Sequence, residues 1–178
     1  MRNNCFLLVI LFVLGFVSES TANDSIALES FESLSDSTRL AELDLYWNEL
    51  TRTVKEGDYE GYGAAYHPDA VVVFTNGKTK KSVPISTALL NWKQGFDNTK
   101  IGLTNDAVEF RLSQRIGNET TAHETGIFHY KSIDVNNKVK ARYLVHFEML
   151  LIKKDGQWLS LMEYQKSSAT EEEWEALK

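Results

Sequence analysis

Cysteine is almost absent from this chain of 178 residues, and Cys5 is the only one. It opens an apolar run that ends at residue 17, and the small residues Ser20 and Ala22 follow at the spacing of a signal-peptidase site. The pattern predicts a signal peptide over residues 1–22 and a secreted or periplasmic protein; because the run is short for a membrane span, a retained anchor is the weaker alternative. Cleavage after Ala22 would remove Cys5, leaving no disulfide, no thiol nucleophile and no cysteine-based metal site.

Basic residues are too few to balance the acidic ones, and the formal net charge is −6 at pH 7. Nucleic acids and anionic membrane surfaces attract basic patches, so this balance argues against both as partners. The sequence also lacks a glycine-rich phosphate loop, a serine nucleophile elbow, a His-Glu-x-x-His helix and any internal repeat. No integral membrane span is expected after signal cleavage, and a small or cationic molecule is the class of ligand left open.

The chain does have a normal domain composition, with 43% hydrophobic and 25% charged residues, which fits one globular domain. The expected elements, in order, are helices over 38–56 and 58–66, strands over 70–74 and 79–83, a helix over 86–96, strands over 103–115 and 121–133, a hairpin over 139–165, and a short acidic helix within 169–178. Residues 23–37 are rich in serine and acidic residues and are expected to form a flexible leader. Helices followed by sequential strands predict an α+β fold with an antiparallel meander.

The strongest local pattern is the Asp155-Gly156 pair between two alternating apolar runs, because a two-residue hairpin turn needs φ > 0 at both positions. Counting back from this turn predicts five cross-strand pairs: Lys154 with Gln157, Ile152 with Leu159, Leu150 with Leu161, Glu148 with Glu163, and His146 with Gln165. One face of the hairpin would then carry two acids side by side. A turn at Asn136-Asn137 extends the register by one strand, setting Thr125 opposite Glu148, Ile127 opposite His146, and His129 opposite Leu144.

The other face of the hairpin is apolar, and a row this apolar would not be left in water. Its members on the first strand are Tyr143, Val145, Phe147, Met149 and Leu151. We expect a homodimer through the Tyr143, Val145, Phe147 and Met149 face. The polar face would then be the one that the helices cover.

The order of these elements, together with "YHPDAVVV" between the second helix and the first strand and "KKDGQW" at the last turn, resembles the nuclear transport factor 2-like superfamily, especially its SnoaL-like and ketosteroid-isomerase-like branch. The resemblance covers about Thr38 to Ser168. It implies a cone-shaped, strongly curved antiparallel sheet whose concave face is closed by the N-terminal helices (cystatin-like or SnoaL-like), a pocket between them, and convex faces that often pair in dimers. In the ketosteroid-isomerase branch an acidic residue on the penultimate strand helps to hold the substrate oxyanion, and Glu148 matches its position. Isomerase activity is not inferred.

Glu148, Glu163 and His146 are the catalytic candidates. Two carboxyls on opposed residues of a cavity cannot easily both ionise, so one pKa would rise, and one Glu would act as the acid and the other as the base. His146, diagonal to both, would relay a proton. The alternative is that both acids are simply solvated. The ligand-binding candidates are the residues expected on the cavity wall: Tyr62, Tyr66, Trp92, Thr125, His129 and Gln165.

A metal site is an alternative use of the same face, because His123, His129 and His146 share it with the two acids. No spacing motif supports that use, so neither a metal nor a cofactor is predicted. Arg111 is expected at the surface, and would turn inward only if the register slipped by one residue.

These observations predict a secreted or periplasmic SnoaL-like domain that binds a small, partly apolar molecule in the cone cavity, with or without cofactor-free acid/base chemistry by the carboxyl pair. The alternative is a non-catalytic structural or protein-interaction module that forms dimers. An enclosed, largely apolar cavity would favour the ligand, whereas an interior filled by Trp92 and leucines would favour the module.

Overall fold

The computed structural model describes the backbone from residue 21 to residue 178 and the side chains from residue 36 onward. The chain divides after Ser33, and all that follows concerns the unit Leu34–Lys178. Helix α1 is assigned to Thr21–Glu56, so residues 23–37, expected as a flexible leader, are helical. The physical reason is that this stretch contains neither glycine nor proline to break a helix. The predicted signal peptide remains a prediction, because residues 1–20 lie outside the described range.

Three short elements and one longer helix follow α1. Gly57 ends α1 with a φ of +67°, and the Asp58 side chain caps α2 (Tyr59–Ala64) by accepting a hydrogen bond from the Gly61 N–H. Strands β1 (Tyr66–Asn76) and β2 (Thr79–Pro84) form a hairpin, and α3 covers Ile85–Lys100. The second helix is therefore shorter than expected, and β1 begins earlier.

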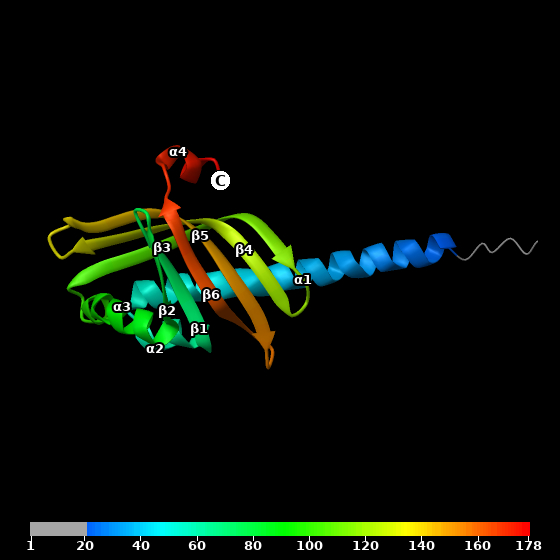
Figure 1. The fold of residues 1–178 in the computed structure, drawn as a ribbon, viewed down its shortest axis with the longest axis horizontal. Coiled ribbons are helices and arrows are strands. Elements are labelled where there is room, and N and C mark those ends of the chain that lie inside the picture. Colours follow the sequence, from blue (N-terminus) through cyan, green and yellow to red (C-terminus); the bar gives the residue numbers. More distant parts are fainter. Residues whose placement is uncertain (1–20) are drawn as a thin grey trace, which may run out of the picture. The chain divides into compact units, whose positions relative to one another are not determined.

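Six strands form one curved sheet in the order β2-β1-β6-β5-β4-β3, and α1, α2 and α3 pack on its concave side (Figure 1). The last four strands are β3 (Thr104–Gly117), β4 (Thr121–Asp134), β5 (Val139–Lys154) and β6 (Gln157–Ser168). All neighbours are antiparallel except β1 and β6, which run parallel. The predicted α+β fold with helices closing the concave face is confirmed, but the sheet is mixed rather than wholly antiparallel.

A bulge in β3 lies opposite a glycine in β4. The register of β3 and β4 shifts between Leu112 and Gln114. Gly126 lies opposite this bulge, and a Cβ atom there would come within 2.1 Å of the Arg111 carbonyl oxygen. Only glycine permits this close approach of the two backbones.

The hairpin register is correct at the turn and wrong beyond it. Lys154 pairs with Gln157 and Ile152 with Leu159, as predicted. The extra residue Leu161 then forms a bulge in β6 and shifts the next pairs by one, and a second irregularity at Lys166 shifts the partner of His146 by two. Three pairs differ from those expected: Leu150 faces Met162, Glu148 faces Tyr164, and His146 faces Ser167. The β4–β5 register is as predicted, including Thr125 with Glu148, Ile127 with His146, and His129 with Leu144.

The two faces of the sheet are also exchanged relative to the prediction. Phe147, Met149 and Leu151 lie on the concave side, where they pack with Leu43 and Trp47 of α1 in the main core. Their burial inside the domain excludes Phe147 and Met149 from an interface between chains. We expected a dimer through the face of Tyr143, Val145, Phe147 and Met149. That choice of face is wrong, because α1 covers Phe147 and Met149. Dimer formation itself remains a prediction.

The short tail helix α4 (Glu171–Glu175) packs on the convex side of the sheet, away from α2 and α3 (Figure 1). Thr170 and Glu173 form the expected capping box. Trp174 is buried with Ile127 and Leu144. No helix among the residues described is long and apolar enough to cross a membrane.

Candidate ligand cavity

A cavity of about 500 Å³ lies between the concave face of the sheet and helices α1, α2 and α3. This volume falls within the range of small-molecule sites in proteins. Its walls are mainly aromatic and aliphatic, and include Val54, Tyr62, Trp92, Phe96, Val108, Phe110, Phe128, Tyr130, Tyr143, Val145, Phe147 and Met149. The polar lining residues are Asn91, Thr99, Asp106, Glu163 and Gln165. The interior is thus not filled by Trp92 and leucines, the arrangement that would have favoured a collapsed core.

Glu163 is the centre of a buried hydrogen-bond network on one wall of the cavity. The bulge at Leu161 turns Glu163 inward, where its side chain is 5% exposed. Tyr66 donates its hydroxyl proton to one carboxyl oxygen, and the Gln165 amide donates to the other at 2.8 Å. The Tyr62 hydroxyl lies 3.2 Å from that of Tyr66. This network joins α2, β1 and β6 at the cavity wall.

Burial changes the acid/base properties of this network. It raises the pKa of Glu163 above its ordinary value, although the hydrogen bonds from Tyr66 and Gln165 act in the opposite direction. Burial also raises the pKa of Tyr62 and of Tyr66, with the nearby Glu163 charge adding to both shifts. The tyrosines are therefore neutral hydrogen-bond donors at physiological pH.

Asp106 is a second buried carboxyl in the same cavity, on β3. Its side chain accepts hydrogen bonds from the Tyr130 hydroxyl at 2.5 Å and from the Ser132 hydroxyl at 2.6 Å. Gly95 of α3 lies beside it, since a Cβ atom built on that glycine would be 3.6 Å from Asp106 Oδ2. Asp106, like Glu163, is bonded only to neutral donors among the described residues.

Glu124 is the third buried acid, and its environment differs. It receives hydrogen bonds from the Trp47 indole N–H and from Arg115, whose Nε is 2.7 Å from Glu124 Oε1. Arg115 also pairs with Asp44 of α1. Glu124 is thus neutralised within the protein, and it does not line the cavity.

The predicted carboxyl pair does not form, because Glu148 and Glu163 point to opposite faces of the sheet. Glu148 lies on the convex face, where it pairs with Lys166, and the hydrogen bond from Lys166 lowers the pKa of Glu148. His123 lies 3.8 Å from the same carboxylate. The acid/base mechanism expected for Glu148, Glu163 and His146 is therefore wrong, since one residue inserted at the bulge separates the two acids.

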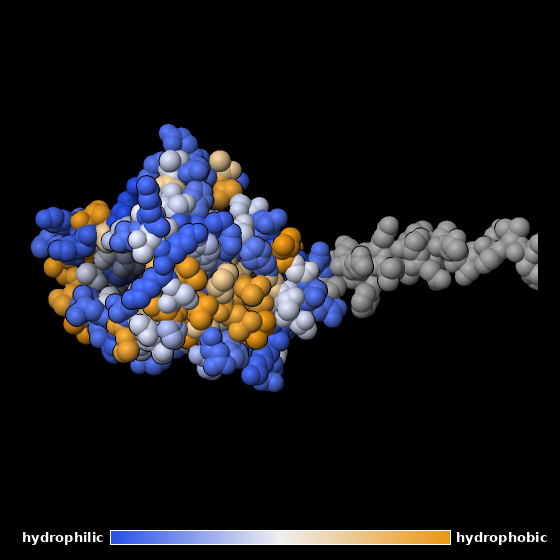
Figure 2. Space-filling model, in the orientation of Figure 1, coloured by the Kyte–Doolittle hydropathy of each residue, from blue (hydrophilic) through white to orange (hydrophobic). Residues whose placement is uncertain are grey.

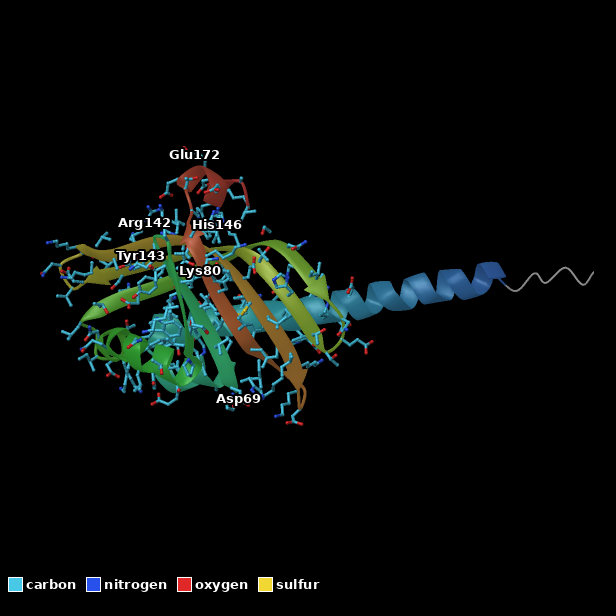
Figure 3. All side chains as sticks on the ribbon, in the orientation of Figure 1. Asp69, Lys80, Arg142, Tyr143, His146 and Glu172 are labelled. Atoms are coloured by element: carbon cyan, nitrogen blue, oxygen red, sulfur yellow. The ribbon has the colours of Figure 1, made fainter. Side chains whose placement is uncertain are left out.

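His146, His129 and Thr125 are also on the convex face. His146 lies next to α4, with Nε2 3.3 Å from Glu173 Oε1 (Figure 3). His129 accepts a hydrogen bond from Arg142 and contacts the Trp174 ring. Their assignment to the ligand cavity is wrong because the helices cover the other face. The described residues contain no group of three or more His, Cys, Asp or Glu side chains arranged to hold a metal ion.

Four of the predicted residues do meet at the cavity: Glu163, Gln165, Tyr62 and Trp92 line it, with Tyr66 directly behind. Sequence reasoning missed Asp106 and Tyr130. Asp106 could have been found from the alternation of β3, because it lies two positions before Val108 and four before Phe110 and so shares their face. Arg111 lies on the convex face with its guanidinium 3.8 Å from the centre of the Trp174 ring, and it does not serve as a counter-ion in the cavity.

Several solved structures resemble this one at low sequence identity. An NTF-2-like protein of unknown function from Shewanella oneidensis MR-1 is 14% identical with a TM-score of 0.56, over 72% of this chain and 99% of that one. The beta subunit of the benzoate 1,2-dioxygenase from Burkholderia mallei is 12% identical with a TM-score of 0.58, over 71% and 88%. A protein from Catenulispora acidiphila in complex with S-DNPA is 13% identical with a TM-score of 0.54, over 72% and 94%.

No family model matches the sequence, and no curated protein matches it. The resemblance to solved structures, at identities below 25%, bears on the fold alone. It agrees with the resemblance found in the sequence, and the chain has the fold of the nuclear transport factor 2-like superfamily.

Proposed function

We propose that this chain is a secreted or periplasmic domain that binds a small, largely apolar molecule in the cavity between the sheet and the helices. The observation that carries the proposal is the cavity itself: about 500 Å³ with aromatic walls and a few buried polar groups. The side chains around an empty apolar cavity lack van der Waals contacts on the side that faces it. An unfilled cavity of this size therefore stabilises the domain less than a packed core would. The structure of the protein from Catenulispora acidiphila in complex with S-DNPA supports a binding role for this fold.

The test is binding of Nile red, a neutral apolar dye, to the wild type and to two matched variants. Gly95 lines the cavity from α3, whereas its neighbour Gln94 is exposed. Gly95→Phe places a ring in the cavity and is expected to weaken saturable binding at least about tenfold. Gln94→Phe adds the same ring outside and should leave binding unchanged. Equal binding by both variants, or no saturable binding by the wild type, would overturn the proposal. Native mass spectrometry of the freshly purified wild type would then identify any ligand that copurifies.

A second candidate function is the protein-interaction module, and an apolar row on the convex face favours it. Met162 of β6 pairs with Val71 of β1 on one side and with Leu150 of β5 on the other, so the three side chains point the same way. Val71 is 36% exposed and Leu150 is 39% exposed. Figure 2 shows an apolar patch over these strands.

We propose this row as the contact surface of the predicted homodimer, since α4 covers the other part of the convex face. Leu150→Lys is expected to give a monomer at micromolar concentration in sedimentation experiments, while Nile red binding stays unchanged. A wild-type chain that sediments as a monomer would contradict the dimer and leave the cavity proposal standing.

A further inference from the structure

The buried acids in the described domain do not all have a positive partner. Glu124 is neutralised by Arg115, whereas Glu163 and Asp106 have only hydroxyl and amide donors. Removing a carboxylate from water without a cation costs free energy, and neutral donors offset only part of that cost. The two acids that lack a cation are also the two that line the cavity.

Among the residues whose side chains the structure describes, no lysine, arginine or histidine lines the cavity. An anionic ligand would therefore enter a low-dielectric space that holds two acids and nothing to neutralise it. The aromatic walls favour a cation, because the faces of aromatic rings attract positive charge and both Trp92 and Tyr62 line the cavity. The acids and the rings therefore select for the same sign of charge.

Building on the proposed ligand-binding function, we propose that the cavity binds organic cations, namely protonated amines with an aromatic or aliphatic body, and that the Glu163 carboxylate is their counter-ion. The amine would displace no protein cation, because none of the described residues at this wall is basic. Asp106 is a second carboxyl in the same cavity, on β3, separated from β6 in the sheet by β4 and β5.

The proposal predicts the direction in which the affinity for an amine changes with pH. The groups that face Glu163 are Tyr66 of β1, Tyr62 of α2, Tyr46 of α1 and Gln165 of β6; Asp106 and Tyr130 face the same cavity from β3 and β4. All the titratable groups among them are acids. Amine affinity should therefore rise with pH while Glu163 ionises, for as long as the amine stays protonated. A ligand that needs a hydrogen bond from protonated Glu163 would show the opposite trend.

The experiment compares three probes that share one indole body: tryptamine, a cation; tryptophol, a neutral alcohol; and indoleacetate, an anion. Isothermal titration of the wild type is expected to show tryptamine binding at least about tenfold more tightly than tryptophol, with indoleacetate the weakest. Glu163→Gln should weaken tryptamine about tenfold and change tryptophol little. Glu148→Gln, on the convex face, is the control and should change neither.

The outcomes separate this inference from the function on which it rests. If Nile red binds but indoleacetate binds as tightly as tryptamine, or if Glu163→Gln keeps the preference for tryptamine, the assignment to cations is overturned and the binding function stands. If Nile red binds and none of the indoles does, the assignment is likewise overturned. If neither the dye nor any indole binds, both proposals fall.

Discussion

The two faces of the β5–β6 hairpin place two glutamates of the same chain in opposite environments. Glu163 lies on the concave face among tyrosines, and its pKa is raised by burial. Glu148 lies on the convex face, and its pKa is lowered by the hydrogen bond from Lys166. The difference shows how strongly a side chain's chemistry depends on which face of a sheet it occupies.

The convex face is organised by ion pairs around α4. Arg142 pairs with Glu171, His146 with Glu173, and Arg111 stacks on Trp174. Ion pairs between exposed side chains contribute little to stability, because water screens the charges. The concave face instead relies on burial of aromatic residues and on hydrogen bonds to uncharged groups. We therefore expect stability to depend on the concave face and on the Trp174 contact, and only weakly on the convex ion pairs.

The largest expected effect separates two neighbours on β5. Phe147 points into the core and is 2% exposed, whereas His146 points to the convex face. Phe147→Ala should lower the free energy of unfolding by about 3–5 kcal/mol, since it removes a buried ring and leaves a void. His146→Ala should lower it by about 1 kcal/mol or less. Urea denaturation of both variants measures the free energy of unfolding. If both variants lose a similar amount, the assignment of the two residues to opposite faces is wrong.

A smaller effect is expected from the contact of Trp174 with Ile127 and Leu144 on the convex face. Trp174→Ala should cost about 2 kcal/mol, less than a central core residue, because the tail helix can detach without unfolding the sheet. Hydrogen exchange should then increase in α4 and at Ile127, which Trp174 covers. Nile red affinity should stay unchanged. A loss of dye binding in this variant would show that the convex face and the cavity are coupled.

The smallest expected effect is a pH dependence of opposite sign at the two glutamates. The pKa of folded Glu163 is raised above 4.5, so its contribution to stability is fully present below the unfolded pKa and is lost as pH rises through the folded value. The pKa of folded Glu148 is lowered, so its contribution is present above the unfolded pKa and is lost as pH falls through the folded value. The Glu163→Gln variant should therefore lose less stability than the wild type as the pH rises toward neutral. The Glu148→Gln variant should lose less stability than the wild type as the pH falls. Denaturant midpoints across this range measure both slopes, and parallel profiles in the two variants would contradict the assignment.

The sequence predicted correctly those features of the fold that depend on residues close together in the chain. Alternation and turn residues predicted the strand order from residue 103 onward, and the Thr170 and Glu173 spacing predicted the capping box. The β4–β5 register was predicted correctly from Thr121 to Ser132. The turn itself has three residues rather than the expected two, but a register shift between Ser132 and Ile133 makes up for the extra residue.

The bulge at Leu161 could not be predicted, because no glycine or proline accompanies it and the alternation of β6 reads continuously through it. The choice of face was also beyond the sequence. Both faces of β5 carry apolar residues, and the row from Tyr143 to Leu151 suits a helix-covered core as well as it suits an interface. Tertiary packing of α1 decides between them. With that choice the expected pair of Glu148 and Glu163 was replaced by Glu163 and Asp106, which line the cavity from different strands.

The most direct test of the central claim is the titration of the Glu163 and Glu148 side chains in one sample, followed by carboxyl-carbon nuclear magnetic resonance and assigned with the two Gln variants. The predicted result is a Glu163 midpoint above 4.5 and a Glu148 midpoint below it, with saturating tryptamine lowering the Glu163 midpoint alone. A Glu163 that titrates at or below 4.5, or a Glu148 that responds to tryptamine in its place, would contradict the account.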